Sequence, residues 1–249
     1  MTRTSSFWDA VYDEYTRWRT STIESIKRGE TFRPFDVSIE ALARLEHPEA
    51  EDVAWITTAL KAAPHEPVLF GGQPWFIAAI IERADSLAEV LFEPFLDAGI
   101  NEVNPSDNRR FIEPCVRAFG ELRTYEYLAH VLECGTDFEK AGAMNAMYWA
   151  TGWSAEAEQP SLGPLRERVK RVVLQTFIRT ANIDLRRALS RWMSLSEPET
   201  TQDLRELQGE ALSIAERLDD DYIRHIVDKA SGKTTLLKAL PHRRRPDAD

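Results

Sequence analysis

Residues 230–237, ASGKTTLL, form the stretch of the chain that most closely matches a nucleotide-binding motif. The string matches the end of the phosphate-binding loop G-x-x-x-x-G-K-[ST], in which backbone amides and a lysine hold the phosphates. However, Val227 stands where the first glycine belongs, the preceding residues have a helical pattern instead of a strand pattern, and sixteen residues follow Lys233. We therefore interpret the string as a glycine-containing helix end, and we expect no nucleotide cofactor.

Two thiols and an imidazole could supply three ligands of a zinc ion. His130 and Cys134 are four residues apart, so they share a face of a predicted helix, and Cys115 lies in the preceding helix. The chain has no C-x-x-C pair and no evident fourth ligand, and free cysteine often packs as a small apolar residue. We therefore expect packing instead of metal binding at this group, although a reactive thiol near His130 stays open.

Paired carboxylates are the remaining candidates for chemistry. Glu93 and Asp97 could share a helix face as a general acid and base, but on an acidic helical protein such a pair is usually a solvated surface. The sequence has no G-x-S-x-G, no H-E-x-x-H and no dinucleotide-binding fingerprint. No catalytic residue is predicted, and the chain is interpreted as non-enzymatic.

The elements that would position these residues are helices. Apolar residues recur at helical spacing, and the chain shows neither sustained strand-like alternation nor an Asn-Gly or Asp-Gly hairpin turn between apolar runs. The sequence thus predicts an all-α protein, whose first helix begins with a capping box at Ser6 and Asp9. The expected helices span about 6–28, 38–46, 49–62, 75–84, 86–98, 108–119, 121–133, 138–150, 165–180, 184–195, 202–217 and 219–231.

Composition and charge narrow the choice of partners. The 249 residues are 43% hydrophobic and 29% charged, with a net charge of −10 and a pI near 5.1. An acidic surface repels a phosphate backbone, so nucleic acid is disfavoured as a partner. The longest apolar run, Trp75 to Ile81, is far shorter than the roughly 20 residues that span a bilayer, and the N-terminus lacks an apolar signal segment. We expect no membrane segment, a cytoplasmic location and reduced thiols.

A recurring pair of charged residues indicates helical repeats. Three predicted helices begin with an aspartate that is followed one turn later by a cation, and we expect the aspartate to cap the helix and the cation to pair with it. These pairs are Asp107 and Arg110, Asp137 and Lys140, and Asp184 and Arg187. The aspartates are 30 and 47 residues apart, and the second interval becomes 34 without the expected loop 152–164. Helical-pair repeats recur every ~34 to ~47 residues.

This pattern resembles the HEAT-like family of α-helical repeat proteins, the α-solenoids. In that family the second helix of a pair commonly begins with Asp followed by Arg, and the aligned pairs form a polar ladder between repeats. The resemblance covers residues 49–231, although the Asp-x-x-Arg/Lys motif itself is confined to 107–195. The N-terminal helix pairs lack the motif, and Pro114 stands inside the first ladder helix, where we expect a kink.

The resemblance implies an α-solenoid of about five helix pairs with an N-terminal capping helix. It divides the chain into a helix and linker at 1–37, a repeat domain at 38–231 and a polar tail at 232–249. Stacked helix pairs create an extended surface, and such surfaces usually bind protein. The expected function is therefore a protein–protein interaction module, such as a scaffold, an adaptor or an inhibitor of the immunity type.

The expected binding face is the concave, exposed side of the second helices, beside the ladder. The predicted binding residues are Arg109, Glu113, Arg117, Asn145, Trp153, Arg186 and Arg191. Two alternatives stay open. Alkylpurine DNA glycosylases resemble HEAT solenoids and use Trp, Asp and Arg in a basic cleft, and this chain has those residue types at Trp149, Trp153, Asp184, Arg187 and Trp192. The other alternative is a helical enzyme or carrier with a pocket near Cys115 and His130.

Overall fold

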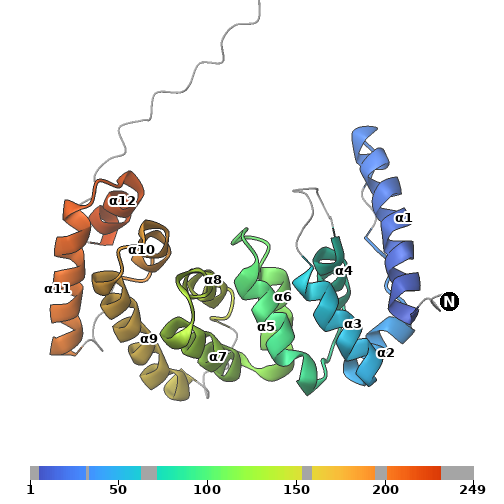
Figure 1. The fold of residues 1–249 in the computed structure, drawn as a ribbon, viewed down its shortest axis with the longest axis horizontal. Helices are drawn as coiled ribbons and strands as arrows, with labels where there is room; N and C mark the ends of the chain where they lie inside the picture. The colour runs from blue at the N-terminus through green and yellow to red at the C-terminus, as the bar shows by residue number, and fades with distance from the viewer. Residues whose placement is uncertain (1–5, 32–33, 63–71, 153–158, 194–200, 231–249) are drawn as a thin grey trace, which may run out of the picture. The chain divides into compact units, whose positions relative to one another are not determined.

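The structure, a computed structural model, is α-helical (Figure 1). It describes residues 6–31, 34–62, 72–152, 159–193 and 201–230. These residues form twelve α-helices and one short 3-10 helix and contain no β-strand, which confirms the all-α prediction. In the same residues, no helix combines the length and the apolar character that crossing a bilayer requires.

The helix bounds agree with the predicted ones to within a few residues at most ends. The α-helices are α1 (Phe7–Lys27), α2 (Ile39–Glu46), α3 (Ala50–Lys61), α4 (Gly72–Ile81), α5 (Phe92–Asn101), α6 (Arg109–Phe119), α7 (Glu121–Cys134), α8 (Asp137–Met147), α9 (Gln159–Arg179), α10 (Ile183–Ser190), α11 (Gln202–Arg217) and α12 (Asp221–Ala230), and the 3-10 helix η1 is Glu89–Leu91. The prediction of a loop through residue 164 was wrong, because α9 already begins at Gln159. Pro160 lies in its first turn, where a proline removes no intrahelical hydrogen bond.

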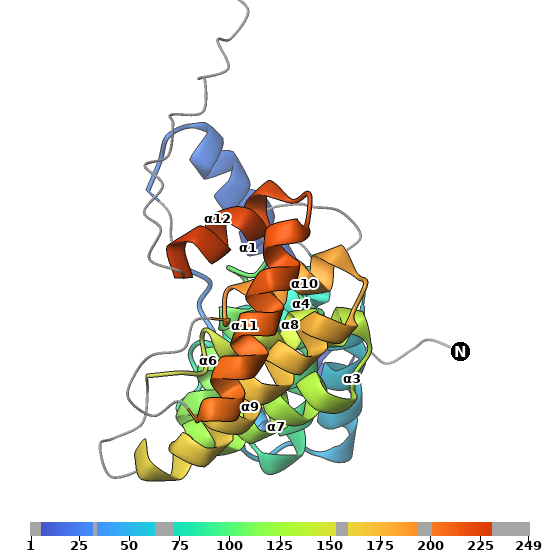
Figure 2. The ribbon, with the colours of Figure 1, turned by 90° about the vertical axis from the view of Figure 1, so that its left-hand side faces the viewer.

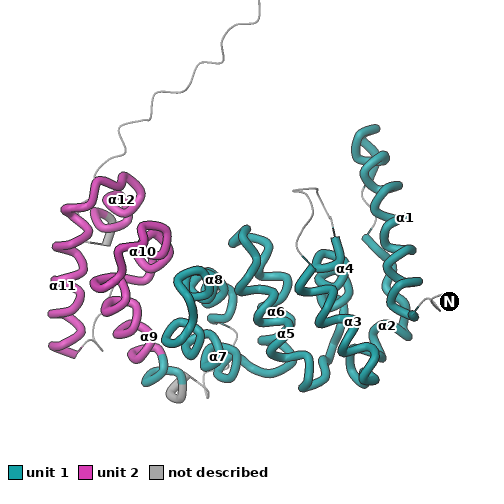
Figure 3. Tube along the Cα trace, in the orientation of Figure 1, with its two compact units in different colours: residues 1–165 teal, residues 166–249 magenta. Residues whose placement is uncertain are grey.

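The chain divides into two compact units, residues 1–165 and 166–249, and the boundary falls inside α9 (Figure 3). The first unit contains α1 together with the helices that follow it, and the expected division at 1–37, 38–231 and 232–249 stays a prediction. In the second unit, α12 packs against both α10 and α11 (Figures 1 and 2).

In the first unit, helices that follow each other in the sequence pack together in pairs. The pairs are α3 with α4, α5 with α6 and α7 with α8. Neighbouring pairs are joined by the packing of α4 on α6 and of α5 on α8. The apolar faces that meet there are fully buried, as at Phe76, Ile80, Phe95 and Leu96. Short connections favour such packing of consecutive helices, and α6 continues through Pro114.

Aromatic side chains of α1 form part of the core. Trp8 and Tyr15 are buried against Trp55 of α3 and Phe76 of α4. The two tryptophans stack with ring centroids 5.9 Å apart. Each also donates a hydrogen bond to the other's helix: Trp8 Nε1 to Asp52 at 2.7 Å, and Trp55 Nε1 to Asp9 at 2.9 Å. The capping box predicted at Ser6 and Asp9 is confirmed.

The aspartates of the expected ladder do not cap their helices, so this prediction was wrong. Thr136 caps α8 through a capping box with Glu139, and Asn182 caps α10 by accepting from the amides of Asp184 and Leu185. The N-cap of α6 is Asn108, whose side chain makes no capping hydrogen bond. Thr and Asn are strong N-cap residues. The aspartates of α8 and α10 occupy the first turn instead, where their negative charge interacts favourably with the helix dipole.

The ion pairs of the structure differ in part from the expected ones. Arg187 pairs with Asp184 at 2.9 Å, as predicted, and also with Asp220 at 2.8 Å. Asp220 is buried and accepts from the amide of Ile223 at the start of α12, so Arg187 links α10 to α12.

Arg110 does not form the expected pair with Asp107. It pairs with Glu82 at 3.2 Å and lies over the ring of Trp75, whereas Asp107 accepts a hydrogen bond from the Asn104 side chain. The pair of Asp137 with Lys140 stays a prediction.

We expect Asp203 of α11 to titrate at unusually low pH. Hydrogen bonds from Arg171 of α9, with a further one from Thr201, lower the pKa of Asp203 to about 2. Since the folded-state pKa is lowered, the contribution of the pair to stability is present above the ordinary pKa of about 3.9 and is lost as the pH falls toward 2. Arg171→Gln is expected to return the Asp203 midpoint toward about 3.9.

Carbon-13 NMR of the Asp203 carboxyl measures this midpoint directly. Lys170→Gln, which removes the neighbouring cation of the same helix, should leave it unchanged. An unchanged midpoint in Arg171→Gln would contradict the role given to this arginine.

Candidate functional site

Helix α5 exposes a polar stripe beside two pockets. Its buried residues, among them Phe95, Leu96 and Ile100, turn one face toward α6 and α8. Glu93, Asp97 and Asn101 recur at a spacing of four, so they lie on the opposite face, and all three are exposed. At about 1.5 Å of rise per residue, the stripe is about 12 Å long.

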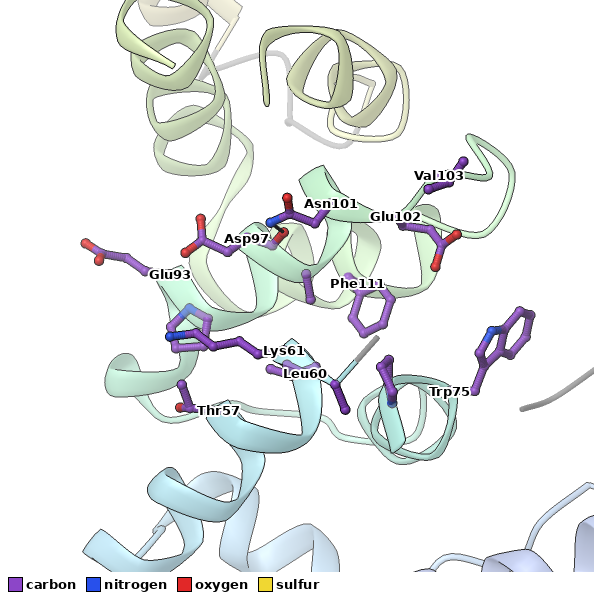
Figure 4. Close-up of a pocket in the computed structure, with 14 residues that line it drawn as sticks. Thr57, Leu60, Lys61, Trp75, Glu93, Asp97, Asn101, Glu102, Val103 and Phe111 are labelled. Atoms are coloured by element: carbon purple, nitrogen blue, oxygen red, sulfur yellow. Dashed lines mark hydrogen bonds between the residues drawn. The ribbon is translucent and has the colours of Figure 1, made fainter. Parts of the chain in front are cut away.

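The larger pocket lies between α5 and the helices α3, α4 and α6, with a volume of about 540 Å³. Figure 4 shows Phe111 between α5 and the side chain of Trp75. The pocket is lined by Thr57, Leu60, Lys61, Ala62, Pro74, Trp75, Glu93, Pro94, Asp97, Ala98, Asn101, Glu102, Val103 and Phe111. Its volume falls within the range of about 300–1,000 Å³ in which pockets enclose a ligand.

The smaller pocket lies on the α7 side of the same stripe and has a volume of about 320 Å³. The two pockets share Asp97 and Asn101, and we call them together the α5 groove. The smaller one is also lined by Ile100, Tyr127, His130, Val131, Cys134, Gly135 and Glu139. The hydroxyl of Tyr127 donates to Asp97 at 2.7 Å. Burial raises the pKa of Tyr127 well above its usual range, and Asp97, Glu93 and Glu139 raise it further, so the hydroxyl stays protonated.

The charge of the larger pocket is negative. Glu93, Asp97 and Glu102 face a single cation, Lys61, among its lining residues. Elsewhere on the same unit, carboxylates such as Glu89 form ion pairs, here with Arg123. By contrast, no cation of the described residues forms an ion pair with any of these three groove carboxylates. The groove therefore combines an apolar floor with carboxylates that form no salt bridge within the described residues, although Arg123 of α7 interacts with Glu93 over a longer distance.

The structure does not assemble the suspected zinc ligands. Cys115 is fully buried, and burial raises the pKa of its thiol far above the usual range, so the thiol is protonated and inert. His130 and Cys134 are exposed and line the smaller pocket. Across the described ranges, no three His, Cys, Asp or Glu side chains come together in a group that could hold a metal ion. Cys115 packs in the core, as the sequence predicted.

The predicted binding residues of the first unit lie mainly on α6, outside the α5 groove. Arg109, Glu113 and Arg117 share one face of α6 because of their spacing of four, and both arginines are exposed. Arg109 lies 5.8 Å from the Trp149 ring, and Arg117 donates to the carbonyl of Glu82 at 3.4 Å. Asn145 is half-buried on α8.

The remaining predicted residues fall elsewhere. Arg186 and Arg191 belong to the second unit, where Arg186 donates to the carbonyl of Phe177 at 3.2 Å and so joins α10 to α9. Trp153 lies outside the described residues. Of the residue types shared with the glycosylases, Asp184 and Arg187 pair with each other.

The groove residues that sequence reasoning missed come from four different helices. Lys61, Trp75, Phe111 and Tyr127 were read as ordinary helix residues, because nothing in their spacing connects them. Glu93 and Asp97 were noticed as a pair but interpreted as solvated surface. The only local signal was that one face of α5 is strongly apolar and the opposite face carries carboxylates.

Comparison with known proteins adds no assignment. No family model matches the chain, and neither a curated protein nor a solved structure matches it.

Proposed function

We propose that this chain is a cytoplasmic, non-enzymatic protein–protein interaction module, built as a HEAT-like stack of about five helix pairs. The proposal places the binding site in the α5 groove. One observation carries it: a pocket of about 540 Å³ combines apolar lining residues with carboxylates of α5 that are exposed. Protein interfaces commonly join such an apolar centre to a polar rim.

The polar groups that line the groove and the packing of consecutive helices both fit an interaction surface. The polar groups of the groove are carboxylates, an amide, an amine, an imidazole and a phenol that burial and Asp97 keep protonated. Its thiol, Cys134, is exposed at the end of α7. The consecutive pairing of α3–α4, α5–α6 and α7–α8 supports the stacked arrangement, in which each pair contributes to an extended surface.

Site-specific photo-crosslinking in cells tests the proposal. A photoreactive residue placed at Val103, which lines the larger pocket and is 78% exposed, is expected to capture a partner protein. The same residue at Val90 is the matched control, since Val90 is an exposed valine of the same unit outside both pockets. Mass spectrometry of the adducts identifies the partner. We expect yields at position 103 to exceed those at 90 at least about tenfold, because crosslinking requires direct contact.

Two outcomes would contradict the proposal. Equal yields at the two positions would mean random collision, and adducts that contain only nucleic acid or small molecules would mean a different class of ligand.

A further inference from the structure

The groove identifies the chemistry of its partner. Resting on the proposed function, we propose that the α5 groove binds a cationic amphipathic α-helix, with apolar side chains in the larger pocket and Lys or Arg side chains along the α5 stripe. Three properties of the groove lead to this partner: its charge, the position of its apolar residues and the absence of a sheet edge in the described structure.

The charge selects a cationic partner. Glu93 and Asp97 are exposed, Glu102 is half-buried, and none of them forms a salt bridge within the described residues, where Lys61 is the one cation that lines the pocket. Within such an open rim, a Lys or Arg of the partner gains a charged contact without displacing an existing ion pair. Charge complementarity of this kind speeds association and excludes acidic partners.

The apolar residues select an amphipathic partner. Leu60 and Val103 line the larger pocket together with the stripe; Leu60 is half-buried, and Val103 leaves 78% of its surface in water. Covering such residues releases water from apolar surface, which is worth about 25 cal/mol per Å². A partner must therefore place apolar side chains on one side and cations on the other.

The hydrogen-bonding needs of the partner's backbone favour a helical partner over an extended one. An extended peptide satisfies its amides and carbonyls by adding to a sheet edge, and the described residues contain no strand that could offer one. A helix satisfies its own backbone groups. Its cations at positions i and i+4 also match the spacing of Glu93 and Asp97, since both helices rise about 6 Å over four residues.

Binding of synthetic helices to the full chain tests this inference. The probe is a fluorescent peptide of about 18 residues, or five turns, with Leu on one face and Lys on the other. Three analogues accompany it: one with Glu in place of Lys, one with the same composition in scrambled order, and one with two central prolines that break the helix. Fluorescence anisotropy is expected to show binding of the Leu–Lys helix at least about tenfold tighter than of any analogue.

Matched charge variants locate the site. Glu93→Lys with Glu102→Lys is expected to weaken binding of the Leu–Lys helix at least about tenfold. Glu14→Lys with Glu46→Lys makes the same change in net charge at exposed residues outside the groove and should alter the affinity less than about twofold. Raising salt from 50 to 300 mM should weaken binding to the wild type, because exposed charges are screened.

The outcomes separate this inference from the proposed function. Equal losses in the two double variants, or equal binding of the Glu analogue, would overturn it. Tight binding of the proline analogue would mean an extended partner and would also overturn it. If the wild type self-associates and the double variant Glu93→Lys with Glu102→Lys does not, a second copy of the chain occupies the groove. Crosslinking at Val103 combined with no peptide binding would refute the cationic helix and leave the interaction function standing.

Discussion

Gly142→Ala is expected to destabilise the protein by about 3 kcal/mol, the upper part of the range for overpacking a core. Gly142 is buried in α8, where a Cβ would overlap the carbonyl oxygen of Ile100 in α5 and lie 2.9 Å from the carbonyl carbon. The obstacle is backbone, so no rotamer change relieves it and the two helices must separate. In a chain of this length, a loss of 1 kcal/mol lowers the Tm by about 2–4 °C, so we expect a fall of about 6–12 °C.

Gly209→Ala is the matched control for this substitution. Gly209 lies in the middle of α11 and is exposed, and a Cβ there meets nothing within 4 Å. Alanine favours a helix over glycine by about 0.5–1 kcal/mol, so this variant should be slightly more stable than the wild type. Thermal unfolding of both variants checks the opposite signs. A Gly142→Ala protein as stable as the wild type would show that α5 and α8 do not approach each other so closely.

Asp52→Ala is expected to cost about 3 kcal/mol, because it leaves the buried indole of Trp8 and the partly buried guanidinium of Arg44 without their acceptor. The Asp52 side chain is 2% exposed and accepts three hydrogen bonds: from Trp8 Nε1 at 2.7 Å, Arg44 Nη1 at 3.0 Å and the amide of Glu49 at 2.9 Å. These donors belong to α1, α2 and the N-terminus of α3. One carboxylate thus ties three helices together.

Asp9→Ala is the matched control for Asp52→Ala, because it removes an aspartate with similar hydrogen-bond partners. Asp9 is also the third residue of a helix with a capping box, and it also accepts from a tryptophan indole, that of Trp55. It is exposed, so water replaces the lost hydrogen bonds, and we expect a cost of about 1 kcal/mol. Urea unfolding followed by tryptophan fluorescence measures both variants. Equal costs would contradict the interpretation that burial sets the larger effect of Asp52.

The predicted helix bounds were accurate because local signals specify them. The Ser6 capping box, the apolar period of α1 and the glycines that follow α1, α6 and α7 all act within a few residues. The errors in the N-caps arose where two local signals compete. At α8 and α10 the aspartates looked like caps, but Thr136 and Asn182 precede them and fill that position.

Which side chains form ion pairs with each other does not follow from neighbouring residues in the sequence. Arg110 has a carboxylate three residues before it, yet it pairs with Glu82 and stacks on Trp75, because the packing of α4 on α6 brings those groups within reach. A single sequence contains no record of such an approach between helices far apart in the chain. The same holds for Asp52, whose burial depends on three helices meeting at one point.

By itself, the sequence determined an all-α chain, the order and approximate extent of its helices, a packed Cys115 and a net charge of −10. These properties follow from composition and from periodicities of a few residues. Only the tertiary structure decided that Glu93 and Asp97 border an apolar pocket, because Leu60, Trp75 and Phe111 reach that pocket from other helices. A groove is formed by the distances between elements, and helical periodicity within one element does not encode those distances.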